Sequence, residues 1–180
     1  DSVALNALLD LDTPGLDGQK LMFRDEVIIN VLETYRRLDT EFGVVADDTA
    51  NNAAAIQTAL NAVRDSNGGT LVFPNGITKI NGDIVTNFNG ERGAVKLLGD
   101  GGNSIIHIAG GAEVIRFQNV PQVIVDGLTF LGTPGNVYDF TKNVLFFAVV
   151  ESAIVRNCRF LGLAVNAPED AVSPFLFNGT

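Results

Sequence analysis

Two adjacent carboxylates, Asp47 and Asp48, stand shortly before Asn51 and are the first candidates for chemistry in this sequence. Cleaving a glycosidic bond by acid and base needs two carboxyl groups about 5 to 10 Å apart across the substrate, whereas neighbours on an extended backbone point in different directions. A calcium site from Asp47, Asp48 and Asn51 has enough oxygen ligands but lacks the spacing of a known calcium loop. We therefore expect turn and helix-cap chemistry here, and no cofactor.

Glu151, Glu169 and Asp170 are better candidates for catalysis. Glu151 lies beside an expected turn, and the other two lie in the loop NAPEDAVSP, residues 166–174, which interrupts a regular pattern. Loops that interrupt a regular scaffold in this way often carry functional residues. Solvated loop charges are the alternative interpretation of all three.

Arg156 and Arg159 are the candidates for substrate binding, because outward guanidinium groups can hold an anionic sugar by paired hydrogen bonds. A surface ion pair is the alternative. The sequence has one histidine, His107, and one cysteine, Cys158, which excludes a multi-His or Cys-based metal site and an internal disulfide. We expect both residues to be structural and no metal to be bound.

The composition is that of a folded domain: 180 residues, 46% of them apolar and 18% charged. A net charge of −9 disfavours a nucleic acid partner, because a phosphate backbone is also negative. The longest apolar run, VLFFAVV at 144–150, is far shorter than the roughly 20 residues of a membrane-spanning helix. We expect neither nucleic acid binding nor membrane insertion.

One amphipathic helix of about 12 to 14 residues is predicted. Ile56, Leu60 and Val63 recur at helical spacing, Asn51 or Asn52 can serve as N-cap, and the pair at 68–69 is Gly-Gly, which ends a helix. A short strand, TLVFP at 70–74, follows and ends in a turn at 75–76. Residues 1–40 form a separate leader segment, in which 25–39 are compatible with helix or strand.

The rest of the sequence contains a repeat. Residues 114–132 align without gaps onto residues 144–162, an offset of 30, with eight identical residues in nineteen positions. Short strands and turns repeating at this period indicate a solenoid, in which each coil stacks on the next. Residues 94–111 have the same character and are expected to form an earlier coil.

Stacking assigns neighbours across coils. Alternation predicts two inward columns, the first from Val123, Val125, Leu128 and Phe130 and the second from Ala153, Val155, Cys158 and Phe160. Asp126 and Arg156 are then neighbours on the outer face, where we predict a salt bridge. The same alternation turns Ile124 and Ile154 outward, as in a subunit interface or under a covering loop.

These features resemble the pectate-lyase-like superfamily of right-handed parallel β-helices. Its members commonly begin F-G-A-x-G-D-G-x-x-D-D-T-x-A-I-Q and continue with G-G-G-T-V-x-F-P-x-G. FGVVADDTANNAAAIQ at 42–57 and NGGTLVFPNG at 67–76 match this pattern in order. The acidic pair of the family falls on Asn51 and Asn52 here, not on Asp47 and Asp48. The resemblance implies an all-β right-handed parallel β-helix over residues 41–180, with an N-terminal capping helix.

ALLDLDTPGLDGQKLMFR at 7–24 resembles the leader that precedes the capping helix in bacteriophage tailspikes. This resemblance implies a homotrimer on the virion tail that binds and cleaves bacterial surface polysaccharide, as hydrolase or lyase. The sequence would then be the N-terminal portion of a β-helix continuing beyond residue 180, inactive alone, with the remaining C-terminal part as its partner. The alternatives are a secreted lyase or hydrolase of the same fold, and a spike or adhesin that binds glycan without cleaving it.

Overall fold

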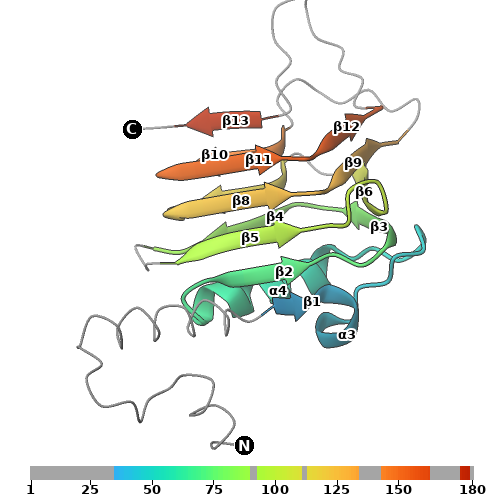
Figure 1. Ribbon diagram of the computed structural model, residues 1–180, viewed down its shortest axis with the longest axis horizontal. Coiled ribbons are helices and arrows are strands. Elements are labelled where there is room, and N and C mark those ends of the chain that lie inside the picture. The colour runs from blue at the N-terminus through green and yellow to red at the C-terminus, as the bar shows by residue number, and fades with distance from the viewer. Residues whose placement is uncertain (1–34, 90–92, 111–112, 134–142, 163–174, 179–180) are drawn as a thin grey trace, which may run out of the picture. The chain divides into compact units, whose positions relative to one another are not determined.

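The protein's computed structural model describes residues 35–89, 93–110, 113–133, 143–162 and 175–178, all within one unit of the chain (Figure 1). Two helices come early: α3, Leu38–Phe42, and α4, Ala53–Asp65. The strands are β1 (Tyr35–Arg37), β2 (Gly69–Val72), β3 (Gly76–Asn81), β4 (Ile84–Asn87), β5 (Ala94–Leu98), β6 (Ser104–Gly110), β7 (Glu113–Gln118), β8 (Gln122–Asp126), β9 (Thr129–Gly132), β10 (Asn143–Ala148), β11 (Ser152–Arg156), β12 (Arg159–Leu161) and β13 (Phe175–Asn178).

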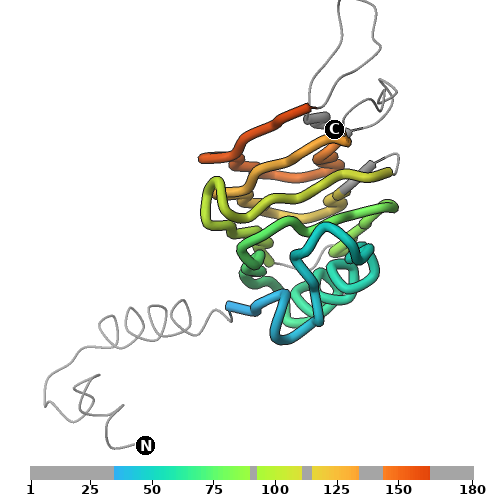
Figure 2. Tube along the Cα trace, turned by 90° about the vertical axis from the view of Figure 1, so that its right-hand side faces the viewer, coloured from blue at the N-terminus to red at the C-terminus, as the bar shows by residue number. Residues whose placement is uncertain are grey.

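The strands form three parallel sheets. Their orders are β1-β2-β5-β8-β11 for the first sheet, β12-β9-β6-β3 for the second and β13-β10-β7-β4 for the third. From β2 onward, successive strands of the chain belong to different sheets, and each strand pairs with one from the coil before or after it, as in Figure 2. This is a parallel β-helix with a helix at its N-terminal side, and it confirms the fold class expected from the sequence.

The offset of the sequence repeat is also the offset between paired residues in the last coils. Phe147 pairs with Phe117, Val155 with Val125 and Phe160 with Phe130, each at the offset of the repeat. β5 and β6 pair with β8 and β9, so residues 94–110 form the earlier coil that the sequence indicated.

The two predicted inward columns are confirmed. Residues of the first are fully buried: Val123, Val125, Leu128 and Phe130. Those of the second pack against the core while remaining partly exposed: Ala153, Val155, Cys158 and Phe160. The rings of Phe130 and Phe160 stack with centroids 5.0 Å apart and planes 6° from parallel, which adds aromatic contact to apolar burial. Ile154 faces outward and is 40% exposed.

Helix α4 covers the early coils with one apolar face. Ile56, Ala59, Leu60 and Val63 are buried in the same core as the strands. The helix ends at Asp65, and Gly68 then donates its N–H to the Val63 carbonyl at 2.8 Å. The predicted length and end of this helix are therefore confirmed.

The start of α4 differs from the expectation in one respect. Asn52 occupies the N-cap position, but its side chain caps nothing in the helix. Its Oδ1 accepts from the Val45 N–H and its Nδ2 donates to the Val45 carbonyl, both at 2.9 Å. The side-chain amide thus replaces a neighbouring strand for Val45, because it offers the same donor and acceptor as a peptide group.

Two further side-chain amides, one just before α4 and one within it, also pair with the backbone groups of strand residues. Asn51 exchanges both hydrogen bonds with the Asn81 backbone at 2.8 and 2.9 Å, and Gln57 does so with the Val85 backbone at 2.7 and 2.8 Å. β3 and β4, which contain Asn81 and Val85, are edge strands of their sheets. The consecutive asparagines therefore complete the hydrogen bonding of the first coils.

Most of the segment 25–39, compatible with helix or strand, lies outside the described residues. Its described end is strand β1 followed by the start of α3, and Gly43 ends α3 with a left-handed φ of 70°. Within the described ranges, no helix combines the length and apolar character needed to cross a membrane.

Candidate functional site

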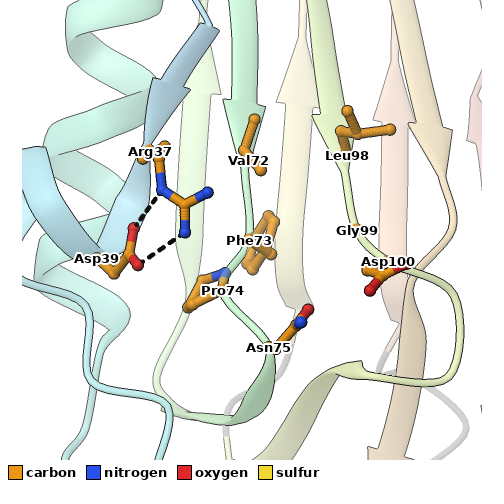
Figure 3. A pocket seen from close by; sticks show the side chains of 9 residues that line it. All are labelled: Arg37, Asp39, Val72, Phe73, Pro74, Asn75, Leu98, Gly99 and Asp100. Carbon is orange, nitrogen blue, oxygen red and sulfur yellow. Dashed lines mark hydrogen bonds and ion pairs between the residues drawn. The ribbon is translucent and has the colours of Figure 1, made fainter.

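A hollow of about 530 Å³ lies on the outside of the first sheet, beside the ends of its early strands (Figure 3). It is lined by Arg37, Asp39, Val72, Phe73, Pro74, Asn75, Leu98, Gly99 and Asp100. Because these strands are parallel, the turns that follow them all lie at the same edge of the sheet. The hollow is made where β1, β2 and β5 reach this edge.

The turns that frame the hollow are held by the next coil. Phe73 donates its N–H to the Leu98 carbonyl at 2.8 Å, and Gly99 donates to the Asp126 carbonyl at 2.9 Å. A Cβ built on Gly99 would lie 2.3 Å from the Gly127 oxygen, so only glycine fits the close approach of these two turns. The turns at the edge of the hollow are therefore packed closely against the next coil.

Arg37 and Asp39 form one side of the hollow. The Arg37 guanidinium binds both oxygens of Asp39, Nε–Oδ1 at 3.2 Å and Nη2–Oδ2 at 2.9 Å. This side-chain hydrogen bond lowers the pKa of Asp39 below its ordinary value, since it stabilises the charged form. Asp39 is therefore a carboxylate at neutral pH.

Asp100 lies on the opposite side of the hollow, beyond Leu98 and Gly99, as Figure 3 shows. Its Oδ2 accepts from Asn103 Nδ2 at 3.2 Å, and Ser104 Oγ lies 3.0 Å from its backbone nitrogen. Two carboxylates, one in helix α3 and one in the turn after β5, thus flank one concave surface, whose middle is apolar.

An outward column continues from the hollow along the stack. Val72, Leu98, Asp126 and Arg156 are successive partners in register. The predicted salt bridge is present, with Arg156 Nη2 2.9 Å from Asp126 Oδ2. Asn157 Nδ2 also donates to Asp126 Oδ1 at 2.9 Å, and this bond, followed by those of Arg156, lowers the pKa of Asp126.

The residues predicted for substrate binding flank one turn. Arg156 ends β11 and Arg159 begins β12, and both are exposed. The Arg159 Nη1 atom lies 3.6 Å from the position of a Cβ on Gly102, so its guanidinium reaches the turn that also contains Asp100. No pattern in the sequence connects Arg159 with Asp100.

Of the residues predicted for catalysis, Glu151 is exposed in the turn before β11. It is separated from Arg156 by the length of that strand, about 16 Å at roughly 3.3 Å per residue, so the structure does not bring the two together. Glu169 and Asp170 lie outside the described residues.

Asp47 and Asp48 have separate roles. Asp47 Oδ1 accepts from the Thr49 N–H at 2.9 Å, which lowers the pKa of Asp47, and from the Thr49 hydroxyl at 2.8 Å. This is the expected turn chemistry. Asp48 instead contacts the Nδ1 atom of His107, and His107 Nε2 contacts Thr133 Oγ1.

The oxygen ligands considered for calcium are engaged by N–H groups. Asn51 Oδ1 accepts from Asn81 and Ala53, and Asp47 Oδ1 from Thr49. Across the described ranges, no three His, Cys, Asp or Glu side chains gather as metal ligands would.

Comparisons with known proteins add a distant structural similarity. No protein-family model and no curated protein matches the chain. Among solved structures, a "putative glycosyl hydrolase" from Parabacteroides merdae ATCC 43184 is similar at a TM-score of 0.33 and 14% identity, over 76% of this chain and 100% of that one.

Proposed function

We infer that this protein is a tailspike-like β-helix that binds a bacterial surface polysaccharide and cleaves its glycosidic bonds. The observation that supports this most directly is the hollow beside the first sheet, with Asp39 and Asp100 on opposite sides. Glycoside hydrolysis uses two carboxyl groups that flank the scissile bond. An open surface of this kind also suits a polymer better than a closed pocket does.

The two carboxylates are suited to different roles. Asp39, ionised and held by Arg37, would act as nucleophile or base. Asp100 would be the second carboxyl group that flanks the scissile bond. In a lyase, Asp39 would instead remove a proton next to a uronic acid carboxyl group, and Arg37 would stabilise the negative charge that develops.

The outward column supplies the binding surface for a chain longer than one sugar. Val72 and Leu98 provide an apolar surface, and Asp126 with Arg156 provides polar groups at the next steps of the register, about 4.8 Å apart. Arg156 and Arg159 remain the proposed contacts to an anionic sugar. The polysaccharide would lie along the stacking direction, across several coils.

Incubation with a panel of capsular and O-antigen polysaccharides tests this function. New reducing ends identify a hydrolase, and ultraviolet absorbance of unsaturated sugars identifies a lyase. We expect D39N and D100N to lower the rate at least about a hundredfold. Asp65, whose partner is Arg64 on α4, provides the control D65N, which should leave cleavage unchanged.

Cleavage that survives both D39N and D100N would exclude the hollow as the active site. Binding to polysaccharide without any cleavage would favour the adhesin alternative. Sedimentation measures the oligomeric state, for which a tailspike requires a trimer. A stable monomer with polysaccharide-cleaving activity would favour the secreted enzyme.

A further inference from the structure

Three side chains from distant parts of the chain form a hydrogen-bonded series on the outside of the second sheet. Asp48 Oδ1 contacts His107 Nδ1, and His107 Nε2 lies 2.9 Å from Thr133 Oγ1. Asp48 precedes α4, His107 lies in β6, and Thr133 follows β9, which is the neighbour of β6 (Figure 1). A carboxylate that orients an imidazole against a hydroxyl is the arrangement that activates a nucleophile.

The sheet places His107 on its outer face. Its neighbours in β6, Ile106 and Ile108, are buried in the core, so alternation turns the imidazole outward. The side chain of His107 is 14% exposed and that of Asp48 is 41% exposed. The ring is thus largely enclosed, while the carboxylate that holds it is partly exposed to solvent.

The proton positions follow from the partners of the imidazole. An ionised carboxylate only accepts hydrogen bonds, so Nδ1 carries the proton that faces Asp48. In the neutral ring, Nε2 is then an acceptor, and the Thr133 hydroxyl donates to it. The Thr133 hydroxyl also donates to the Ile108 carbonyl at 3.0 Å, so this carbonyl and Nε2 compete for the one hydroxyl proton.

A cationic side chain stands next to this series. Lys79 in β3 is the register partner of His107 in β6, and neighbouring strands are about 4.8 Å apart. The residues on either side of Lys79, Thr78 and Ile80, are buried, so Lys79 also faces outward. An ammonium group in this place would stabilise the oxyanion formed when the hydroxyl attacks a carbonyl carbon.

The geometry points to an esterase site with Thr133 as nucleophile, His107 as base, Asp48 as the positioning residue for His107, and Lys79 as the oxyanion partner. The substrate class is a small carboxylic ester, such as an acetyl ester on a sugar hydroxyl. The site lies on the second sheet and shares no residue with the hollow of the first, so it does not depend on the polysaccharide-cleaving function.

The reaction proceeds in two balanced steps. Thr133 Oγ bonds to the acyl carbon while its proton moves to His107 Nε2, and the ester C–O bond then breaks as the leaving alcohol takes that proton. Water attacks the acyl-threonine, gives a proton to His107 Nε2, and releases the carboxylic acid as that proton returns to Thr133. The net change is ester plus water to alcohol plus acid, with no redox step.

Hydrolysis of p-nitrophenyl acetate by the full chain tests the site. We expect T133V and H107Q to lower the enzyme-dependent rate at least about a hundredfold, and T133S to keep activity because a serine hydroxyl can occupy the same place. D48N should lower kcat about a hundredfold or more with little change in KM, and D48E should restore part of it. K79M should lower kcat less than D48N does.

The matched control is T58V, because the Thr58 hydroxyl donates to the Ala54 carbonyl on α4, away from this series. It should hydrolyse the ester at the wild-type rate. Thermal unfolding of each variant separates loss of activity from loss of fold.

A fluorophosphonate probe gives a second readout on the wild-type protein and needs no substitution. Peptide mass spectrometry should locate the adduct on Thr133, and the labelling should disappear in H107Q while persisting in T58V. The inference is overturned by a wild-type rate equal to that of a folded T133V, or by the absence of an adduct on Thr133.

Discussion

Asp126 and Arg156 occupy the same position in successive coils and face each other on β8 and β11, with Arg156 Nη2 2.9 Å from Asp126 Oδ2. The side chain of Asp126 is 13% exposed, while that of Arg156 is 57% exposed. Asp126 also accepts from Asn157, which adopts a left-handed φ of 54°. The carboxylate therefore holds the strand and the turn after it, whereas the arginine contributes one exposed contact.

We expect D126A to destabilise the protein more than R156A. Loss of the exposed guanidinium costs about 0.5 kcal/mol, as for other surface ion pairs. D126A removes the Asn157 bond as well and should cost about 1.5 kcal/mol. Urea unfolding of both variants measures the difference in their free energies of unfolding. Equal losses would show that the Asn157–Asp126 hydrogen bond does not contribute to stability.

The same carboxylate should make stability depend on acid pH. Its pKa is lowered in the folded state, so the stabilisation is fully present above the ordinary carboxyl pKa of about 3.9. It is lost as the pH falls through the lower, folded value. The stability difference between wild type and D126N should therefore shrink below about pH 4, and a constant difference from pH 7 to pH 2.5 would contradict this.

Asn52 should be intolerant of both alanine and aspartate. It is 3% exposed, and its Nδ2 faces the carbonyls of Val45, Ala50 and Lys79. Alanine leaves the Val45 peptide groups without their partner, at a cost of about 2 kcal/mol. Aspartate places a charge against these carbonyls and should cost at least as much at pH 7. Unfolding of N52A, N52D and the surface control T58A compares them.

Gly99 and Gly102, in the same turn region, should differ in their tolerance of alanine. A Cβ on Gly99 meets the Gly127 oxygen at 2.3 Å and a Leu128 methyl at 2.4 Å, whereas one on Gly102 has only Arg159 Nη1 at 3.6 Å. G99A should destabilise by about 2 to 3 kcal/mol because the turns must separate. G102A should be within about 0.5 kcal/mol of wild type, and a similar loss in both would refute the close approach.

Cys158 should react slowly with alkylating reagents. Burial raises the pKa of its thiol, so less of it is the reactive thiolate at pH 8. Iodoacetamide labelling followed by mass spectrometry should be several-fold slower than for free cysteine, and should reach the ordinary rate in 8 M urea. Equal rates in the folded and unfolded protein would show that the thiol is not protected.

The parts of the fold that could be predicted are those encoded by a local sequence pattern or by an exact sequence repeat. Helix α4 follows from the spacing of Ile56, Leu60 and Val63, whose buried face needs no distant information. The Asp126–Arg156 pair follows from the sequence repeat, whose offset is the same in all three sheets of the last coils. Once the repeat is recognised, adding its offset to a residue number gives the partner of that residue in the next coil.

The early coils do not share that period. Gly76 pairs with Ser104 and Ile105 pairs with Thr129, at two different offsets that are both shorter than the repeat of the last coils. Because the turns differ in length, no constant offset connects Asp48, His107 and Thr133, and the sequence carries no sign of their series. The hollow was missed for a similar reason, since the pattern around Arg37 and Asp39 was compatible with either helix or strand.

The amides of Asn51 and Gln57 also bear on aggregation. Unpaired N–H and C=O groups on an edge strand are a template for a strand from another molecule. At Asn81 and Val85, on the edge strands β3 and β4, side-chain amides already occupy both groups. A strand from another molecule therefore cannot pair with the backbone groups of Asn81 and Val85. The helix that completes the core thus also protects the protein against polymerisation through this end of the stack.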